Sequence, residues 1–312
     1  MNNNKLWFKW KKNSCRYDSF SLIYAFIIYP KLQESGITPE NFNEDYINKL
    51  FYNCIQLKER DYKIGFWEYL KKNKENNLDL TTSLMCFGKK GSLYQILDLF
   101  KCDNNFCFVY ELEEGCTKDN CIKRLTSKNY LNPYIIYKEE DIISNESISN
   151  KFNSLLTNEL TICKICGYND KGIILDESKP TFYRLIIKKI YPKIIFVIFD
   201  LSDINDKDTR SELEIIECSR RKNYNDKLFK VLVNNFSYEN HNYELKALIL
   251  TPQSDHFTSV LLNYDKGVLG LKKGVNYFYD GLKAKHYIEE INNLHDLIKD
   301  NIVYLGLYIE KI

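Results

Sequence analysis

Apolar side chains in the first hundred residues recur every three or four positions, which is the spacing of helices with one buried face. Residues 13–30, NSCRYDSFSLIYAFIIYP, predict a helix that Ser14 caps, that runs to about Tyr29 and that Pro30 ends. Further segments with helical spacing are 43–55, 64–77 and 92–100. The amino-terminal third is therefore expected to be helical.

From about residue 101 the pattern changes to short apolar runs between polar, Asn-rich turns, which predicts strands. The earlier runs are 105–112, 133–137, 172–175 and 182–190. The later and more apolar runs are 193–201, 228–238, 243–250, 256–264, 275–282 and 301–312, which should form the central sheet. Residues 138–156 fit either a loop or a helix, and a helix is expected near 288–299.

Helices followed by a cysteine-bearing ribbon and then by antiparallel strands predict an α+β fold. The chain has 312 residues, no internal repeat and no linker rich in proline or glycine. One domain spanning 1–312 is therefore expected.

The charge balance is nearly even, with 44 Lys and Arg against 42 Asp and Glu. Because a phosphate-binding protein needs a basic face, no nucleic-acid partner is expected. The opening residues lack the apolar core of a secretory signal, and no apolar run reaches the ~20 residues of a membrane span. A cytoplasmic or nuclear protein without a membrane partner is expected. Its 10 cysteines should then be ligands, catalytic residues or core, not disulfides.

Two cysteine pairs have the spacing of a tetrahedral zinc site: Cys116 and Cys121, then Cys163 and Cys166. Four thiolates leave no open coordination position, so such a zinc ion would be structural. The alternative is a set of unrelated thiols. Cys102 and Cys107 also form a C-x4-C pair, and this pair is the alternative to Cys116 and Cys121 as zinc ligands. Cys54, Cys86 and Cys218 lack partners at ligand spacing and are expected in the core.

Cys15 differs because it would occupy the first position of the predicted helix. Free backbone N–H groups and the helix dipole favour an anion there, and therefore a thiolate. A cysteine nucleophile also needs a nearby histidine as base. Taken alone, the segment fits either a buried thiol or a nucleophile.

Of the four histidines, His256 opens a predicted strand, which suits a general base as well as a surface residue. Asp280 ends the next strong strand. An antiparallel pairing of the two strands would bring Asp280 beside His256, where it could orient the imidazole. The alternative for Asp280 is a plain Asp-Gly turn. His241 is expected in an exposed turn, and His286 and His295 on or near a solvated helix.

Three segments in chain order resemble the ubiquitin-specific proteases, the papain-like cysteine deubiquitinases. They are the cysteine segment 13–19, NSCRYDS, the strand pair YELKALIL and DHFTSVLL, and the strand end YFYDGLK. The cysteine segment WKKNSCRYD is also similar in character to that of the SUMO-specific member of this clan. The resemblance covers nearly the whole chain.

The resemblance implies a hand-like fold, with a helical thumb (1–100), zinc-ribbon fingers (101–190) and an antiparallel β palm (191–312). It implies a thiol isopeptidase that removes ubiquitin, or a modifier such as SUMO, after a C-terminal Gly-Gly. Cys15 would be the nucleophile, His256 the base, and Asp280 the group that orients it.

One departure from the family concerns the oxyanion hole. The family's asparagine five residues before the cysteine is Trp10 here, which leaves Asn13 as the candidate side chain. The alternative function is a weak or inactive pseudoprotease that binds the modifier. The sequence does not distinguish ubiquitin from SUMO.

Overall fold

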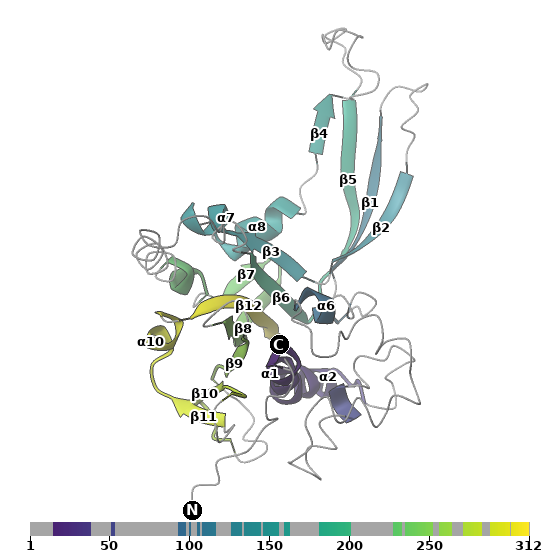
Figure 1. Cartoon of the computed structure of the whole chain (residues 1–312). Helices are drawn as coiled ribbons and strands as arrows, with labels where there is room; N and C mark the ends of the chain where they lie inside the picture. The colour runs from purple at the N-terminus through teal and green to yellow at the C-terminus, as the bar shows by residue number, and fades with distance from the viewer. Residues whose placement is uncertain are drawn as a thin grey trace, which may run out of the picture.

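The structure is a computed structural model. It describes residues 15–38, 51–53, 93–97, 100, 105–106, 108–116, 126–132, 134–144, 146–155, 159–162, 181–200, 227–232, 235–251, 256–263, 271–282, 288–299 and 301–311. Figure 1 shows two groups of strands, with the amino-terminal helix packed beside the larger one.

The amino-terminal helix is longer than predicted. It consists of α1 (Cys15–Ile23), a π-helical turn η1 (Tyr24–Ile28) and α2 (Tyr29–Glu34). The prediction that Pro30 ends it was wrong. Proline is tolerated in the first turn of a helix, and Pro30 occupies the first turn of α2, directly after the wider π turn. The helix ends at Gly36 instead, where a positive φ of 76° allows a Schellman motif in which Ile37 N–H donates to Leu32 O.

The larger sheet has the strand order β11-β10-β9-β8-β12-β6-β3, with β7 paired to β8. Its pairs are antiparallel except for β3 and β6, which run parallel. The strands are β3 (Tyr134–Lys138), β6 (Ile194–Asp200), β7 (Phe236–Tyr238), β8 (His241–Thr251), β9 (Thr258–Leu261), β10 (Asn276–Tyr279), β11 (Ile288–Ile291) and β12 (Ile302–Lys311). The predicted central sheet is thus present and mostly antiparallel.

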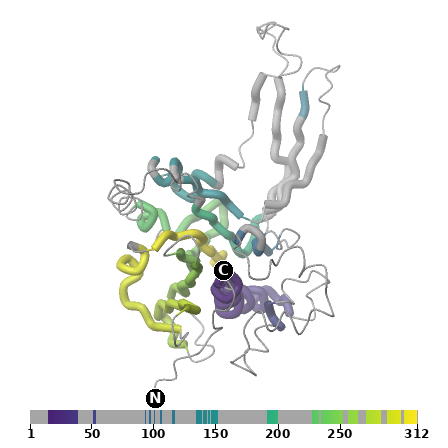
Figure 2. The backbone as a smooth tube through the Cα atoms, in the orientation of Figure 1, coloured from purple at the N-terminus to yellow at the C-terminus, as the bar shows by residue number. Residues whose placement is uncertain are grey.

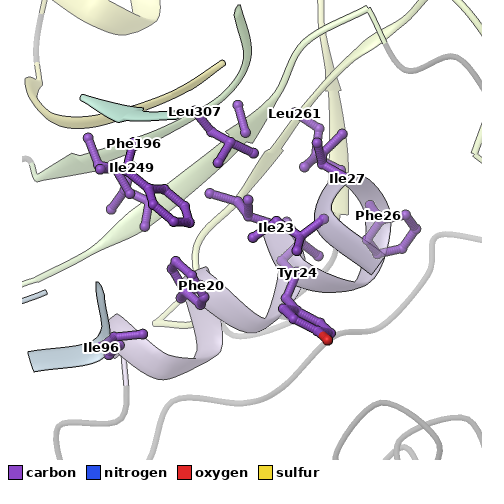
Figure 3. Close-up of a cluster of buried hydrophobic side chains, with 14 of the residues drawn as sticks. Phe20, Ile23, Tyr24, Phe26, Ile27, Ile96, Phe196, Ile249, Leu261 and Leu307 are labelled. Atoms are coloured by element: carbon purple, nitrogen blue, oxygen red, sulfur yellow. The ribbon is translucent and has the colours of Figure 1, made fainter. Parts of the chain in front are cut away.

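This sheet is apolar on both faces, which explains the nearly continuous apolar runs in its strands. Phe196, Ile249 and Leu307 project to the face covered by the amino-terminal helix, where Phe20 and Ile23 meet them (Figure 3). The opposite face holds a second core that includes Val197, Leu248 and Val260. Helical residues pack into that second core from residues 227–232 and from three short helices, α7 (Glu139–Ile143), α8 (Ile148–Leu155) and α10 (Leu294–Lys299).

Segments far apart in sequence meet where the amino-terminal helix lies on the sheet. α1 packs against β9 and β8, and Figure 2 shows the purple helix beside these green strands, more than 200 residues later in the chain. This packing joins the two segments that carry Cys15 and His256.

The smaller sheet has four antiparallel strands in the order β2-β1-β5-β4. They are β1 (Phe108–Cys116), β2 (Thr126–Asn132), β4 (Glu159–Ile162) and β5 (Thr181–Ile190). The sheet extends away from the larger one (Figure 1). It occupies the region expected to form the fingers, and the division of the chain into thumb, fingers and palm stays a prediction.

Several short segments differ from their predicted type. Residues 228–238 were expected as one strand, but 227–232 are helical and only β7 is extended. Leu228 and Leu232 are both buried, and their four-residue spacing fits a helix face as well as a strand. The helix expected over 288–299 is β11 followed by α10 (Leu294–Lys299), and 138–156 contains α7 (Glu139–Ile143) and α8 (Ile148–Leu155). In the first hundred residues, α6 (Tyr94–Leu97) lies in a predicted helix.

None of the helices in the described ranges is long and apolar enough to cross a membrane. The architecture is a mixed α and β fold with a mostly antiparallel sheet, as the element order predicted.

Candidate active site

Cys15 is the first residue of α1 and is 4% exposed. The apolar positions Phe20, Ile23 and Tyr24 are fully buried and hold this end of the helix on the sheet. The thiol therefore lies at a helix start, where unpaired backbone N–H groups favour a thiolate. Ser14, predicted as the cap, lies outside the described residues.

His256 and Asp280 are brought together by the predicted strand pairing. β9 and β10 are antiparallel with Ser259 opposite Tyr279, so the residues before β9 and after β10 meet at one end of the pair. His256 Nε2 lies 2.7 Å from Asp280 Oδ1. Asp280 also accepts the Leu282 N–H at 2.9 Å, so the aspartate forms the tight turn and orients the histidine at once.

The charges around His256 favour its protonated form. Burial lowers the pKa of His256, but the hydrogen bond that His256 donates to Asp280 and the interaction with Cys15 raise it more, to about 9. The Nδ1 atom is buried and has no partner with hydrogen-bond geometry among the described residues. Since Asp280 engages Nε2, Nδ1 is the nitrogen available to the Cys15 sulfur. The three groups therefore form a thiol–imidazole–carboxylate series.

Two polar side chains close to this site are buried from solvent. Asp18 and Tyr279 are 0% and 1% exposed. Burial raises the pKa of Tyr279 well above its usual value, and Asp18, Asp280 and Cys15 raise it further. Tyr279 therefore remains a neutral phenol beneath the site.

Asn13, the predicted oxyanion residue, lies outside the described residues, as does Trp10, which stands where the family has its asparagine. His241 is half-buried, not exposed, and its Nδ1 lies 2.5 Å from Glu310 Oε1. His295 lies in the first turn of α10, and its ring contacts the ring of Phe229 edge-on. His286 is also outside the described residues.

Of the predicted zinc ligands, only Cys116 lies in the described part of the chain. It ends β1, opposite Phe182 of β5, and is half-buried with its thiol free of any disulfide. β4 ends at Ile162, one residue before Cys163, which like Cys121 and Cys166 is outside the described residues. No cluster of three or more possible metal ligands occurs within the described ranges.

One polar contact across the site has no counterpart in the sequence analysis. The Ser19 hydroxyl donates to the Phe257 carbonyl at 2.9 Å, and this bond is buried. The four-residue spacing from Cys15 places Ser19 on the same helix face, which is the signal that could have identified it.

Searches against family models and curated protein sequences find no match for this chain. Solved structures do match its fold. The pseudoubiquitin hydrolase of Pan2 from Saccharomyces cerevisiae is 12% identical, with 99% of this chain and 86% of that chain covered and a TM-score of 0.50. The Pan2 pseudoubiquitin hydrolase–RNA exonuclease module, solved with AACCAA RNA, gives 11% identity and a TM-score of 0.54, with 99% of this chain covered.

This chain spans 54% of that module, about half of its length. The same module solved with AAUUAA RNA matches at 12% identity with a TM-score of 0.51, over 99% of this chain and 54% of the module. At these identities the likeness concerns the fold alone, which resembles that of the Pan2 pseudoubiquitin hydrolase domain. It supports the expected hand-like protease fold only in its coarse form, as a ubiquitin-hydrolase-like arrangement of a mostly antiparallel sheet and helices.

The exclusion of nucleic-acid partners was wrong. Two of the similar structures are modules in complex with RNA, so this fold occurs in nucleic-acid-binding assemblies. The exclusion rested on the total charge of the chain, and total charge does not describe how charge is distributed over a surface.

Proposed function

We propose that this chain is a cysteine isopeptidase that removes ubiquitin, or a ubiquitin-like modifier such as SUMO, from proteins. The observation that carries the proposal is the position of His256, bonded to Asp280 at 2.7 Å and interacting with Cys15. A nucleophile, a base and a group that orients the base are the parts of a cysteine hydrolase. The ubiquitin-specific-protease branch and the SUMO-specific branch are both part of this proposal, as is a cytoplasmic or nuclear location.

In the proposed reaction, the Cys15 thiolate attacks the carbonyl carbon of the last glycine in the modifier's C-terminal Gly-Gly. The carbon–nitrogen bond breaks as protonated His256 gives its proton to the leaving amine. Water then attacks the thioester, His256 takes a proton from that water, and the thiolate leaves. Asp280 holds the ring throughout. The Cys15 backbone N–H at the helix start would stabilise the oxyanion, together with Asn13.

The test is reaction with ubiquitin and SUMO that carry an electrophile, such as a vinyl sulfone, at the C-terminus. We expect a covalent adduct at Cys15 with at least one probe, and none with Cys15→Ala. Cys116→Ser serves as a control for thiols in general and should still form the adduct at Cys15. Absence of an adduct with either probe, on folded protein whose Cys15 is reduced, would contradict the proposal.

A second candidate function is a module that binds the modifier without cleaving it. The observation in its favour is that the similar yeast domain is named a pseudoubiquitin hydrolase. Binding of unmodified ubiquitin or SUMO by calorimetry, combined with no adduct at Cys15, would favour this alternative. An RNA oligonucleotide belongs in the same titration, since the similar modules were solved with RNA.

We further propose that the smaller sheet carries one structural zinc ion, held by Cys116, Cys121, Cys163 and Cys166. Both β1 and β4 run antiparallel to β5, and Cys116 and Thr161 each align with Phe182. Cys116 and Ile162, the last residue of β4, therefore lie at the same end of the sheet. Four thiolates in two short turns suit tetrahedral zinc, which would tie these turns together.

Elemental analysis of the purified protein should give about one zinc per chain, as four thiolates form one site. Cys116→Ser should lower that content, whereas Cys15→Ser, which alters a cysteine in α1, should leave it unchanged. Cys107→Ser tests the other pair, Cys102 and Cys107. Equal zinc content in Cys116→Ser and the unaltered protein would exclude this ligand set.

A further inference from the structure

A single buried hydrogen bond links the two halves of the candidate active site. The Ser19 hydroxyl donates to the Phe257 carbonyl at 2.9 Å, across a separation of 238 residues. Ser19 is fully buried and Phe257 is 8% exposed. The bond therefore joins the helix that carries Cys15 directly to the residue that follows His256.

Ser19 and Phe257 each lie close in sequence to one residue of the proposed catalytic pair. Ser19 lies four residues after Cys15, about 6 Å along the same helix face, because each residue rises about 1.5 Å. Phe257 follows His256 directly. One turn of α1 therefore brings the Cys15 thiol and the Ser19 hydroxyl close to two adjacent residues, His256 and Phe257. The hydroxyl donates its hydrogen bond to Phe257.

Phe257 lies outside the paired residues of the larger sheet. The ladder between β8 and β9 begins at Thr258, so Phe257 lies just before its first aligned pair. The next residue before His256 that the structure describes is Thr251, the last of β8. The Phe257 carbonyl is therefore held by the helix and not by the ladder between β8 and β9.

We propose that Ser19 is a positioning residue that fixes the distance between the Cys15 sulfur and the His256 imidazole. Without its hydroxyl, the apolar packing of α1 on the sheet remains, but the polar contact that sets the spacing between the first turn of α1 and Phe257 is lost, and the Phe257 carbonyl loses a buried donor. Because attraction between a thiolate and an imidazolium falls with distance, a wider separation disfavours the thiolate. The proposal rests on the proposed catalytic pair, but its test requires no modifier.

The experiment follows alkylation of Cys15 by iodoacetamide as a function of pH, with the Cys15 peptide quantified by mass spectrometry. The variants are Ser19→Ala and its matched control Ser21→Ala. Ser21 is a fully buried serine of the same helix whose hydroxyl donates to the Asp18 carbonyl at 2.8 Å, within the helix. Each variant removes one buried hydroxyl; the Ser19 bond to Phe257 crosses the site, whereas the Ser21 bond to Asp18 lies within the helix.

Ser19→Ala should move the pH profile of Cys15 alkylation to higher pH and slow alkylation at pH 7 about tenfold, because the thiolate loses part of its stabilisation. Ser21→Ala should leave the rate at pH 7 within about twofold of that of the unaltered protein. If Ser19→Ala does not fold, Ser19→Cys replaces it, since a thiol of similar size donates only weakly. Trypsin cleaves after Arg16, so the Cys15 peptide remains separate from residue 19.

Two outcomes overturn the assignment of Ser19. An unchanged pH profile in Ser19→Ala shows that the bond does not set the separation, and equal changes in both variants show a general loosening of α1. If His256→Ala leaves the alkylation of Cys15 unchanged at every pH, that result instead contradicts the thiol–imidazole pair, and with it the proposed function.

Discussion

His256→Ala should lower the rate at which the protein hydrolyses a ubiquitin or SUMO amide by a factor of about 10² to 10⁴. The variant removes the group that is bonded to Asp280 and interacts with Cys15. The leaving amine then loses its proposed proton donor, and the thiolate loses the adjacent imidazolium. The measurement is kcat/KM with a fluorogenic amide of whichever modifier forms the Cys15 adduct.

The same variant should change how stability depends on pH. The pKa of His256 is raised to about 9, above its ordinary ~6.5. A group with a raised pKa stabilises the folded protein fully below the unfolded value, and that contribution is lost as pH rises through the folded value. The unfolding free energy of the unaltered protein should therefore fall between about pH 6.5 and 9, and that fall should be smaller in His256→Ala.

Asp280→Asn is the matched control for this prediction. It keeps the size of the side chain but removes the charge that contributes most to raising the pKa of His256. We expect pH dependence intermediate between the unaltered protein and His256→Ala. Identical pH profiles in all three proteins would mean that His256 is not held as a buried cation beside Asp280.

The site was predictable where its geometry is local. Cys15 was placed at a helix start by the apolar spacing that follows it, and the helix does begin there. The neighbouring strands before Asp280 and after His256 were expected to pair because a short connection joins them, and Ser259 does lie opposite Tyr279. Predicting that His256 and Asp280 meet therefore required no assumption about segments far apart in the sequence.

Features set by packing or by long-range contacts were not predictable. Pro30 does not end its helix because the π turn before it changes the backbone bonding, which no residue pattern encodes. Leu228 and Leu232 fit either a helix or a strand, and burial against the second core decides between them. Helical spacing places Ser19 on the same face as Cys15, but its bond to Phe257 joins residues 238 apart, and no sequence pattern identifies that partner.

Phe20→Ala should lower the free energy of unfolding by about 3–5 kcal/mol, a large share of the ~5–15 kcal/mol of a typical domain. Phe20 is fully buried, and its ring lies 5.2 Å from that of Phe51, 5.8 Å from Phe100 and 6.0 Å from Phe196. These partners come from separate parts of the chain. Alanine would leave a cavity that the helix, the sheet and the intervening segments cannot all close.

Urea unfolding measures this loss. Leu282→Ala is the control, because Leu282 is 52% exposed, and truncating it should change stability by no more than ~0.5 kcal/mol. Phe20→Leu, which retains most of the apolar volume, should lose less than Phe20→Ala. A loss below ~1 kcal/mol in Phe20→Ala would mean that the ring is not enclosed, and that the helix bearing Cys15 is not anchored to the sheet through this position.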